Sequence, residues 1–191
     1  YYPKQLSAVP FTPVAGPRLL ARRGGDVANM RAALAGLLRD TAERAGMSGV
    51  HVNFTIAEDQ AALEAAGFLR RHDCRFLWRN RGYRDFEDFL DGFRADKRKK
   101  TRRERRRVAE SGAEFRSLAG HEVPGELWRT IFAFTERTFL RHGNAHYLSA
   151  EFLEQVAHRM RGAITVKLAE RDGEAIAAAI FFQGGGSLYG R

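Results

Sequence analysis

Apolar side chains in the first third of the chain follow helical spacing in one long segment, with strand-like alternation on either side of it. Asp26 is a good N-cap residue, and the apolar residues that follow it on one helical face until Gly46 are Val27, Met30, Leu34, Leu37 and Leu38. The pattern also predicts a shorter helix at residues 58–66 and an extended or turn-like start at residues 1–17, where four of the five prolines lie. Strands are predicted at residues 18–21, 50–56 and 70–79. This order of elements implies a mixed sheet with helices packed on its faces.

The pattern begins again after residues 80–82. Asp85 is a second predicted N-cap, and the apolar residues that follow it at i, i+3, i+4 and i+7 are Phe86, Phe89, Leu90 and Phe93. We expect this helix to continue through the basic stretch that follows and to end at residues 111–112. The restart indicates a second structural unit.

Two further helices are predicted in this second part, after a strand at residues 114–118. One begins at Pro124 and runs to about residue 141, and the other is capped by Ser149 and ends near Gly162. The first is rich in aromatic residues at helical spacing, which are Trp128, Phe132, Phe134 and Phe139. At this spacing aromatic residues usually form core, and we prefer that interpretation to a base-stacking platform.

The clearest local pattern is a β-hairpin near the end of the chain. Apolar residues alternate through residues 164–168 up to Asp172 and Gly173, and they alternate back through residues 176–182. Three glycines at 184–186 then turn the chain into a short strand at residues 187–190. Together the predicted elements give an α/β (α+β) protein with mixed sheets and flanking helices.

Charge is concentrated in one segment. The formal net charge is +9, and residues 94–107 hold ten Lys or Arg against two acidic residues, a net of +8 that leaves +1 for the rest of the chain (9 − 8). The candidate anion-binding or nucleic-acid-binding residues of this helix are Lys97, Arg98, Lys100, Arg102, Arg103 and Arg106.

Several interpretations of the basic helix stay open. Like charges at i, i+4 spacing gain from an anionic partner, which could be a cofactor phosphate, a nucleic-acid backbone such as that of tRNA, or a membrane surface. The block has no apolar face for membrane insertion and no aromatic residue for base stacking. A plain solvated face is the remaining interpretation.

The sequence also argues against disulfides, metal sites and membrane-spanning segments. The single cysteine, Cys74, excludes an internal disulfide and a Cys-based zinc site, and it fits a reducing compartment. His51, His142 and His146 stand at no metal-ligand spacing, so no metal is expected. No apolar run approaches the ~20 residues that span a bilayer, and no signal peptide is visible. We expect a cytoplasmic protein. Because the chain starts without Met, we also expect it to be a fragment of a longer protein.

Two stretches resemble parts of the GNAT acyltransferase fold. The segment HVNFTIAEDQAALEAAGFLRRHDCRFLW resembles its closing β-α-β unit, with Gly67 and Phe68 at the turn before the final strand. The segment VKLAERDGEAIAAAIFFQGGGSLYGR resembles its central hairpin. More specifically, YYPKQLSAVPFTPVAGPRLL, NRGYRDFEDFL, KRKKTRRERRRV and SLYGR together resemble the peptidoglycan biosynthesis/recognition family, which is related to the Fem-type aminoacyl and acyltransferases.

This resemblance implies two GNAT-like domains in tandem. Residues 1–82 would be the C-terminal half of the first domain, and residues 83–191 the N-terminal half of a second domain that is incomplete at Arg191. The implied reaction is transfer of an acyl or aminoacyl group to an amine, which could belong to a cell-wall precursor. The implied donor is acetyl-CoA, another acyl donor or an aminoacyl-tRNA, and the full-length protein would be required.

The resemblance also suggests site residues. The family's donor turn, Gln/Arg-x-x-Gly-x-Gly/Ala, aligns with Arg22 and Gly25, whereas Val27 occupies its last small position and would crowd a phosphate. Arg22, Gly24 and Gly25 are therefore candidate cofactor ligands, and a plain turn is the competing interpretation. For catalysis the candidates are His146 and Tyr147, which would bind the acceptor, and Tyr189, which would donate to the leaving group.

Two rival functions stay open at this point. The chain could be a non-catalytic nucleic-acid-binding module centred on the basic helix, or a recognition scaffold whose acyltransferase halves have lost activity. The absence of a catalytic triad does not decide between them, because acyl transfer from an activated donor depends mainly on positioning and oxyanion stabilisation.

Overall fold

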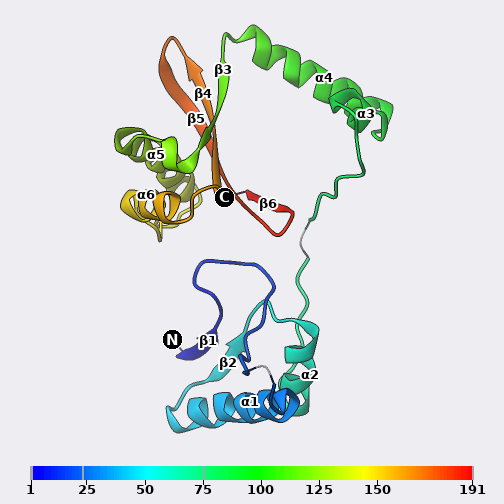
Figure 1. The fold of residues 1–191 in the computed structure, drawn as a ribbon, viewed down its shortest axis with the longest axis vertical. Coiled ribbons are helices and arrows are strands. Elements are labelled where there is room, and N and C mark those ends of the chain that lie inside the picture. Colours follow the sequence, from blue (N-terminus) through cyan, green and yellow to red (C-terminus); the bar gives the residue numbers. More distant parts are fainter. Residues whose placement is uncertain (1, 23, 75, 191) are drawn as a thin grey trace. The chain divides into compact units, whose positions relative to one another are not determined.

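The structure, a computed structural model, describes residues 2–22, 24–74 and 76–190 and divides the chain into two compact units, Tyr1–Arg79 and Asn80–Arg191 (Figure 1). The α/β class is confirmed, with helices beside two separate sheets. Whether each unit is half of a GNAT-like domain stays a prediction. The parts of our predictions that fall on Tyr1, Arg23, Arg75 and Arg191 lie outside the described residues.

The first unit is built from two strands and two helices. Its elements in chain order are β1 (Lys4–Ser7), α1 (Val27–Arg44), β2 (Gly49–Val52) and α2 (Ala57–Ala65). The strands β1 and β2 pair in parallel, with Lys4 opposite Gly49 and Ser7 opposite Val52. The predicted cap of α1 is confirmed, since the Asp26 carboxylate accepts the backbone N–H of Asn29.

Two predicted strands of this unit are wrong. Residues 18–21 form no strand, and the strand that pairs with β2 is β1, in the segment expected to be irregular. A physical reason is that the backbone N–H groups of Arg18 and Leu19 donate to the Asp59 carboxylate, which takes them out of any sheet ladder. The described part of residues 70–79 is also not a strand, and its Phe76 side chain is 96% exposed. The alternation of residues in this segment predicted a strand, but a strand also needs a partner with which to pair.

Two helices open the second unit, α3 (Phe86–Asp91) and α4 (Ala95–Glu110). Asp85 caps α3 as predicted, because its carboxylate accepts the backbone N–H of Asp88. The prediction of one continuous helix is wrong: α3 ends at Gly92, and the extended backbone of Arg94 (φ −59°, ψ 148°) starts α4 in a new direction. Glycine has low helix propensity, and this outweighs the continuing helical pattern.

A four-stranded antiparallel sheet follows in the order β3-β4-β5-β6. Its strands are β3 (Glu114–Ala119), β4 (Ile164–Arg171), β5 (Glu174–Gly184) and β6 (Ser187–Gly190). The predicted hairpin is confirmed between β4 and β5. Its turn residues Asp172 and Gly173 both have positive φ, 54° and 81°, as a tight hairpin turn requires.

The core of the second unit lies between this sheet and the helices α5 (Gly125–Arg141) and α6 (Ala150–Arg159), which lie together beside it (Figure 1). The short 3-10 helix η1 (Gly120–Glu122) joins β3 to this layer. Trp128 and Ile131 of α5 are fully buried against Ile164 and Ile180 of the sheet. The prediction that the aromatic helix supplies core is confirmed for Trp128. No helix among the described residues is long and apolar enough to cross a bilayer.

Gly120 lies where the backbone packs tightly against the side chains of Ile164 and Ala157. A Cβ atom at this position would lie 2.8 Å from Ile164 Cβ and 3.2 Å from Ala157 Cβ, both on packed elements that cannot move away freely. We expect Gly120→Ala to lower the free energy of unfolding by about 1–3 kcal/mol, the usual cost of overpacking. Urea unfolding measures this effect, and Gly125→Ala is the control, because its added Cβ would meet only the flexible end of Glu154. Equal stability of the two variants would contradict the packing described here.

Candidate functional site

The predicted donor turn lies directly before α1. Arg22, Gly24 and Gly25 are all exposed there, and Gly24 has a φ of 90°. The N-terminus of α1 already holds the carboxylate of Asp26, which accepts from Asn29 N–H at 3.1 Å. A carboxylate at this position repels a second anion and occupies one backbone N–H that a phosphate would need. The turn therefore does not fit the pyrophosphate of an acyl-CoA, and we derive no step through that group.

A buried carboxylate anchors the chain just before this turn. Asp59, near the start of α2, is fully buried, and its Oδ2 accepts the backbone N–H groups of Arg18 and Leu19 at 2.5 and 3.3 Å. Its Oδ1 lies 3.2 Å from Arg31 Nε on α1. Asp59 thus ties two helices and a loop together. Sequence reasoning missed it, since an acidic residue in the first turn of a helix is normally exposed.

The predicted acceptor residues lie in the loop between α5 and α6. The His146 ring packs on Phe132 and Phe139 of α5, with ring centroids 4.6 and 4.4 Å apart, and Tyr147 meets Phe139 edge-on at 5.2 Å. The backbone N–H of Leu148 donates to His146 Nδ1 at 3.0 Å. The same Nδ1 also lies 3.1 Å from the carbonyl oxygen of Leu148, so the backbone of this residue holds the ring in place through one nitrogen.

Tyr189 belongs to a different element. It lies on β6, the edge strand, opposite Phe182 of β5, and its side chain is 41% exposed. Phe182 and Phe132 pack against the same core cluster of the second unit. Tyr189 lies opposite Phe182, and His146 contacts Phe132. The structure brings His146 and Tyr147 together and places Tyr189 on a separate strand.

A charged cap follows the acceptor loop. Ser149 caps α6, and hydrogen bonds from the Glu151 backbone N–H and the Ser149 side chain lower the pKa of the Glu151 carboxyl, with Arg129 adding a smaller effect. A lowered folded-state pKa means that the charged carboxylate stabilises α6 above its ordinary pKa of 4.5. That contribution is lost as the pH falls through the lowered value.

One face of the basic helix α4 contacts α3, and two carboxylates of α3 pair with arginines on it. Arg98 Nη1 lies 2.8 Å from Asp91 Oδ1, and Arg102 Nε donates to Glu87 Oε2 at 2.9 Å. The guanidinium carbon of Arg105 lies 4.1 Å from the centre of the Phe86 ring. These three arginines recur at i, i+4 and i+7, so a single face of α4 contacts α3. That face is not simply solvated.

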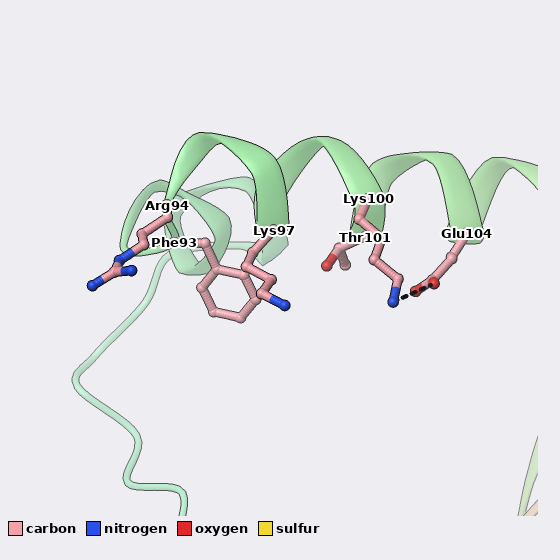
Figure 2. Close-up of a pocket in the computed structure, with 6 residues that line it drawn as sticks. All are labelled: Phe93, Arg94, Lys97, Lys100, Thr101 and Glu104. Atoms are coloured by element: carbon pink, nitrogen blue, oxygen red, sulfur yellow. Dashed lines mark ion pairs between the residues drawn. The ribbon is translucent and has the colours of Figure 1, made fainter.

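Two shallow grooves run along α4. The first, of about 440 Å³, is lined by Phe93, Arg94, Lys97, Lys100, Thr101 and Glu104. Figure 2 shows the Phe93 ring beside Lys97 and the ion pair between Lys100 and Glu104, whose Nζ and Oε1 atoms are 3.7 Å apart. The second, of about 380 Å³, is lined by Ala95, Arg98, Lys99, Arg102 and Arg106, and contains no acidic side chain. Arg103 is exposed on the same helix.

A family model described as FemAB-like, peptidoglycan biosynthesis/recognition, matches residues 1–191. The chain belongs to this FemAB-like family. No curated protein and no solved structure gives a significant match. FemAB-like membership extends over both structural units, and it confirms the Fem-type relationship that the sequence segments suggested.

Membership gives the function at a coarse level. The FemAB-like family connects the chain with peptidoglycan biosynthesis and with Fem-type transferases. The acyl group, its donor and the GNAT relationship stay predictions. Within the described ranges, no group of three or more His, Cys, Asp or Glu side chains lies close enough to hold a metal ion, and Cys74 is exposed and unpaired with another cysteine.

Proposed function

We propose that this FemAB-like protein transfers an acyl or aminoacyl group to an amine of a cell-wall precursor. The observation that carries the proposal is the family match over the whole chain, which includes both units and the sheet with its β4–β5 hairpin. A protein connected with peptidoglycan and related to Fem-type transferases is best explained as an enzyme of this class.

The reaction needs few side chains. The amine nitrogen attacks the carbonyl carbon of an ester or thioester, a C–N bond forms, and the C–O or C–S bond breaks. The amine loses a proton, and the leaving oxygen or sulfur takes one up. In the proposal, the Tyr189 phenol supplies the proton to the leaving group and is reprotonated through water with the proton that the amine loses, while His146 and Tyr147 hold the acceptor by hydrogen bonds. Both His146 and Tyr147 are fixed by ring packing in the α5–α6 loop.

An aminoacyl ester is the donor that the described residues favour over acyl-CoA. The turn of Arg22, Gly24 and Gly25 precedes a helix whose N-terminus is capped by Asp26, and this carboxylate opposes a pyrophosphate. An aminoacyl-tRNA would place its ester in the second unit without using that turn.

Radiolabelled donors test the proposal. The protein is incubated with a precursor that carries a free amine, together with labelled acetyl-CoA or labelled aminoacyl-tRNA, and the label in the precursor is counted. We expect transfer from the aminoacyl-tRNA, and Tyr189→Phe and His146→Gln should reduce it at least tenfold, as loss of a proton donor or a positioning group does. His72→Gln, at an exposed histidine of the first unit, is the matched control and should keep full activity. No label in the precursor from either donor would overturn the proposal.

A further inference from the structure

Helix α1 has a second apolar face in addition to the one that packs in the core. Leu34 and Leu38 pack against the core of the first unit, on the side of α1 where β2 and α2 lie (Figure 1). Residues 27–38 contain one charged side chain, Arg31, and it points inward to the buried Asp59. The exposed residues of this stretch are all uncharged, and they are Ala28, Asn29, Met30, Ala32, Ala33 and Leu37. A helix side that faces only water normally carries charged and polar residues.

Two large apolar side chains form the centre of this exposed side. Met30 is 53% exposed and Leu37 is 54% exposed, and they share one side of the helix with Ala33 through i, i+3 and i+7 spacing. We call these three residues the outer face of α1. Asp26 precedes the outer face by four residues and Arg44 follows it by seven, so both stay on the same side of the helix. Among the described residues, neither Asp26 nor Arg44 forms an ion pair.

We infer that the outer face of α1 pairs with the same face of a second copy of this chain, in antiparallel orientation. In a two-fold symmetric helix pair, residues that meet across the interface are centred on one position of the helix. Ala33 and Leu37 are centred on position 35, and so are Asp26 and Arg44. One symmetry axis therefore places Leu37 against Ala33 twice and Asp26 against Arg44 twice. A parallel pair would instead place Asp26 beside Asp26 and Arg44 beside Arg44, where like charges repel.

The antiparallel pair has the composition of a protein interface. Its centre is apolar, and the large Leu37 of one copy meets the small Ala33 of the other, which lets the two helices approach closely. Its ends are charged, and ion pairs at an interface rim fix orientation more than affinity. The Asp26 carboxylate accepts the backbone N–H of Asn29 at 3.1 Å and has further lone pairs for a guanidinium.

The pair of helices is a small interface, so the dimer should be weak. An interface below the standard size gives a dissociation constant on the order of 10–100 μM. Self-association of α1 goes beyond the proposed transfer reaction, because it needs neither the acyl donor nor the acceptor.

Sedimentation equilibrium of the chain from about 5 to 500 μM tests the inference, and the apparent mass should rise from one copy towards two. Leu37→Glu should raise the dissociation constant at least about tenfold, because it places two carboxylates against an apolar surface. Leu69→Glu is the matched control and should change nothing, since Leu69 is 93% exposed in the same unit and lies outside α1. Arg44→Ala should raise the dissociation constant about two- to thirtyfold, the range for two lost surface ion pairs. Circular dichroism checks that the variants stay folded.

Cysteine cross-linking tests the antiparallel register, with Cys74→Ser removing the one native thiol. Positions 33 and 37 of different copies face each other in the proposed pair, whereas two copies of position 33 are offset by about 6 Å along the helix axis. Disulfides form only between Cα atoms less than about 7 Å apart. A mixture of the A33C and L37C variants, oxidised with glutathione disulfide, should therefore give mainly the mixed dimer, which mass spectrometry distinguishes from the two homodimers.

Three outcomes would each overturn the inference. They are a chain that stays monomeric up to about 500 μM, which would mean that a different partner or a lipid surface covers the outer face, equal effects of Leu37→Glu and Leu69→Glu, and cross-linking of A33C to itself in preference to L37C. Loss of acyl transfer with dimerisation intact would overturn only the proposed function. A monomeric chain that still transfers the acyl group would overturn only the inference about α1.

Discussion

Replacing Asp59 by alanine is expected to destabilise the first unit by about 3–5 kcal/mol, the usual cost of removing one partner from a buried ion pair. The variant leaves the partly buried Arg31 guanidinium without its carboxylate and leaves the backbone N–H groups of Arg18 and Leu19 without their acceptor. The loop before α1 would then lose its attachment to α2. We expect this unit to open while the second unit stays folded.

Hydrogen exchange followed by mass spectrometry measures this effect unit by unit. Peptides from α1 and α2 should lose protection in Asp59→Ala, and peptides from α5 and α6 should keep it. Glu58→Gln is the matched control, because Glu58 is exposed in the same helical turn and should change protection little. If Asp59→Ala behaved like Glu58→Gln, the buried pair would not be the anchor that we describe.

Trp128→Ala is expected to have an effect of similar size on the second unit. Trp128 is fully buried in the cluster that joins α5 to the sheet, and truncating a buried aromatic side chain costs about 3–5 kcal/mol through lost burial and the cavity left behind. Because this cluster also supports Phe132 and through it His146, the acceptor loop should loosen as well.

Urea unfolding and the protection of α5 peptides measure this second effect. Phe134→Ala on the same helix is the control, since Phe134 is only partly buried and the Arg137 guanidinium carbon lies 5.2 Å from the centre of its ring. That change should cost about 1 kcal/mol or less. Equal losses in the two variants would contradict the assignment of Trp128 to the core and Phe134 to its margin.

Local signals in the sequence predicted much of the fold. The caps at Asp26, Asp85 and Ser149 and the turn at Asp172 and Gly173 were all confirmed, because each depends on residues within a few positions of one another. The strand β1 was missed because its partner β2 lies more than forty residues away, from Lys4 to Gly49, and a Pro-rich segment gives no local sign of such pairing. Asp59 was missed because an acidic residue in the first turn of a helix is normally exposed, and the N–H groups that it accepts lie 41 and 40 residues away in the sequence.

The sequence predicted where the candidate site residues lie in the chain, but not which contacts their side chains make. The sequence located the cations of α4, but only the structure shows that Arg98 pairs with Asp91 and Arg102 with Glu87 of α3. The break at Gly92 that allows α3 to fold back along α4 was not predicted, because the apolar spacing continues across it. The donor turn was located correctly as a turn, yet the carboxylate of Asp26 makes its chemistry different from a phosphate site.

The most direct test of the central claim, that this FemAB-like chain modifies an amine of a cell-wall precursor, is the mass of that precursor after incubation with protein and donor. The account predicts that a precursor with a free amine gains the mass of one acyl or aminoacyl group, while the same precursor with its amine acetylated beforehand gains none. An unchanged mass of the free-amine precursor, or an equal gain in both, would contradict the account.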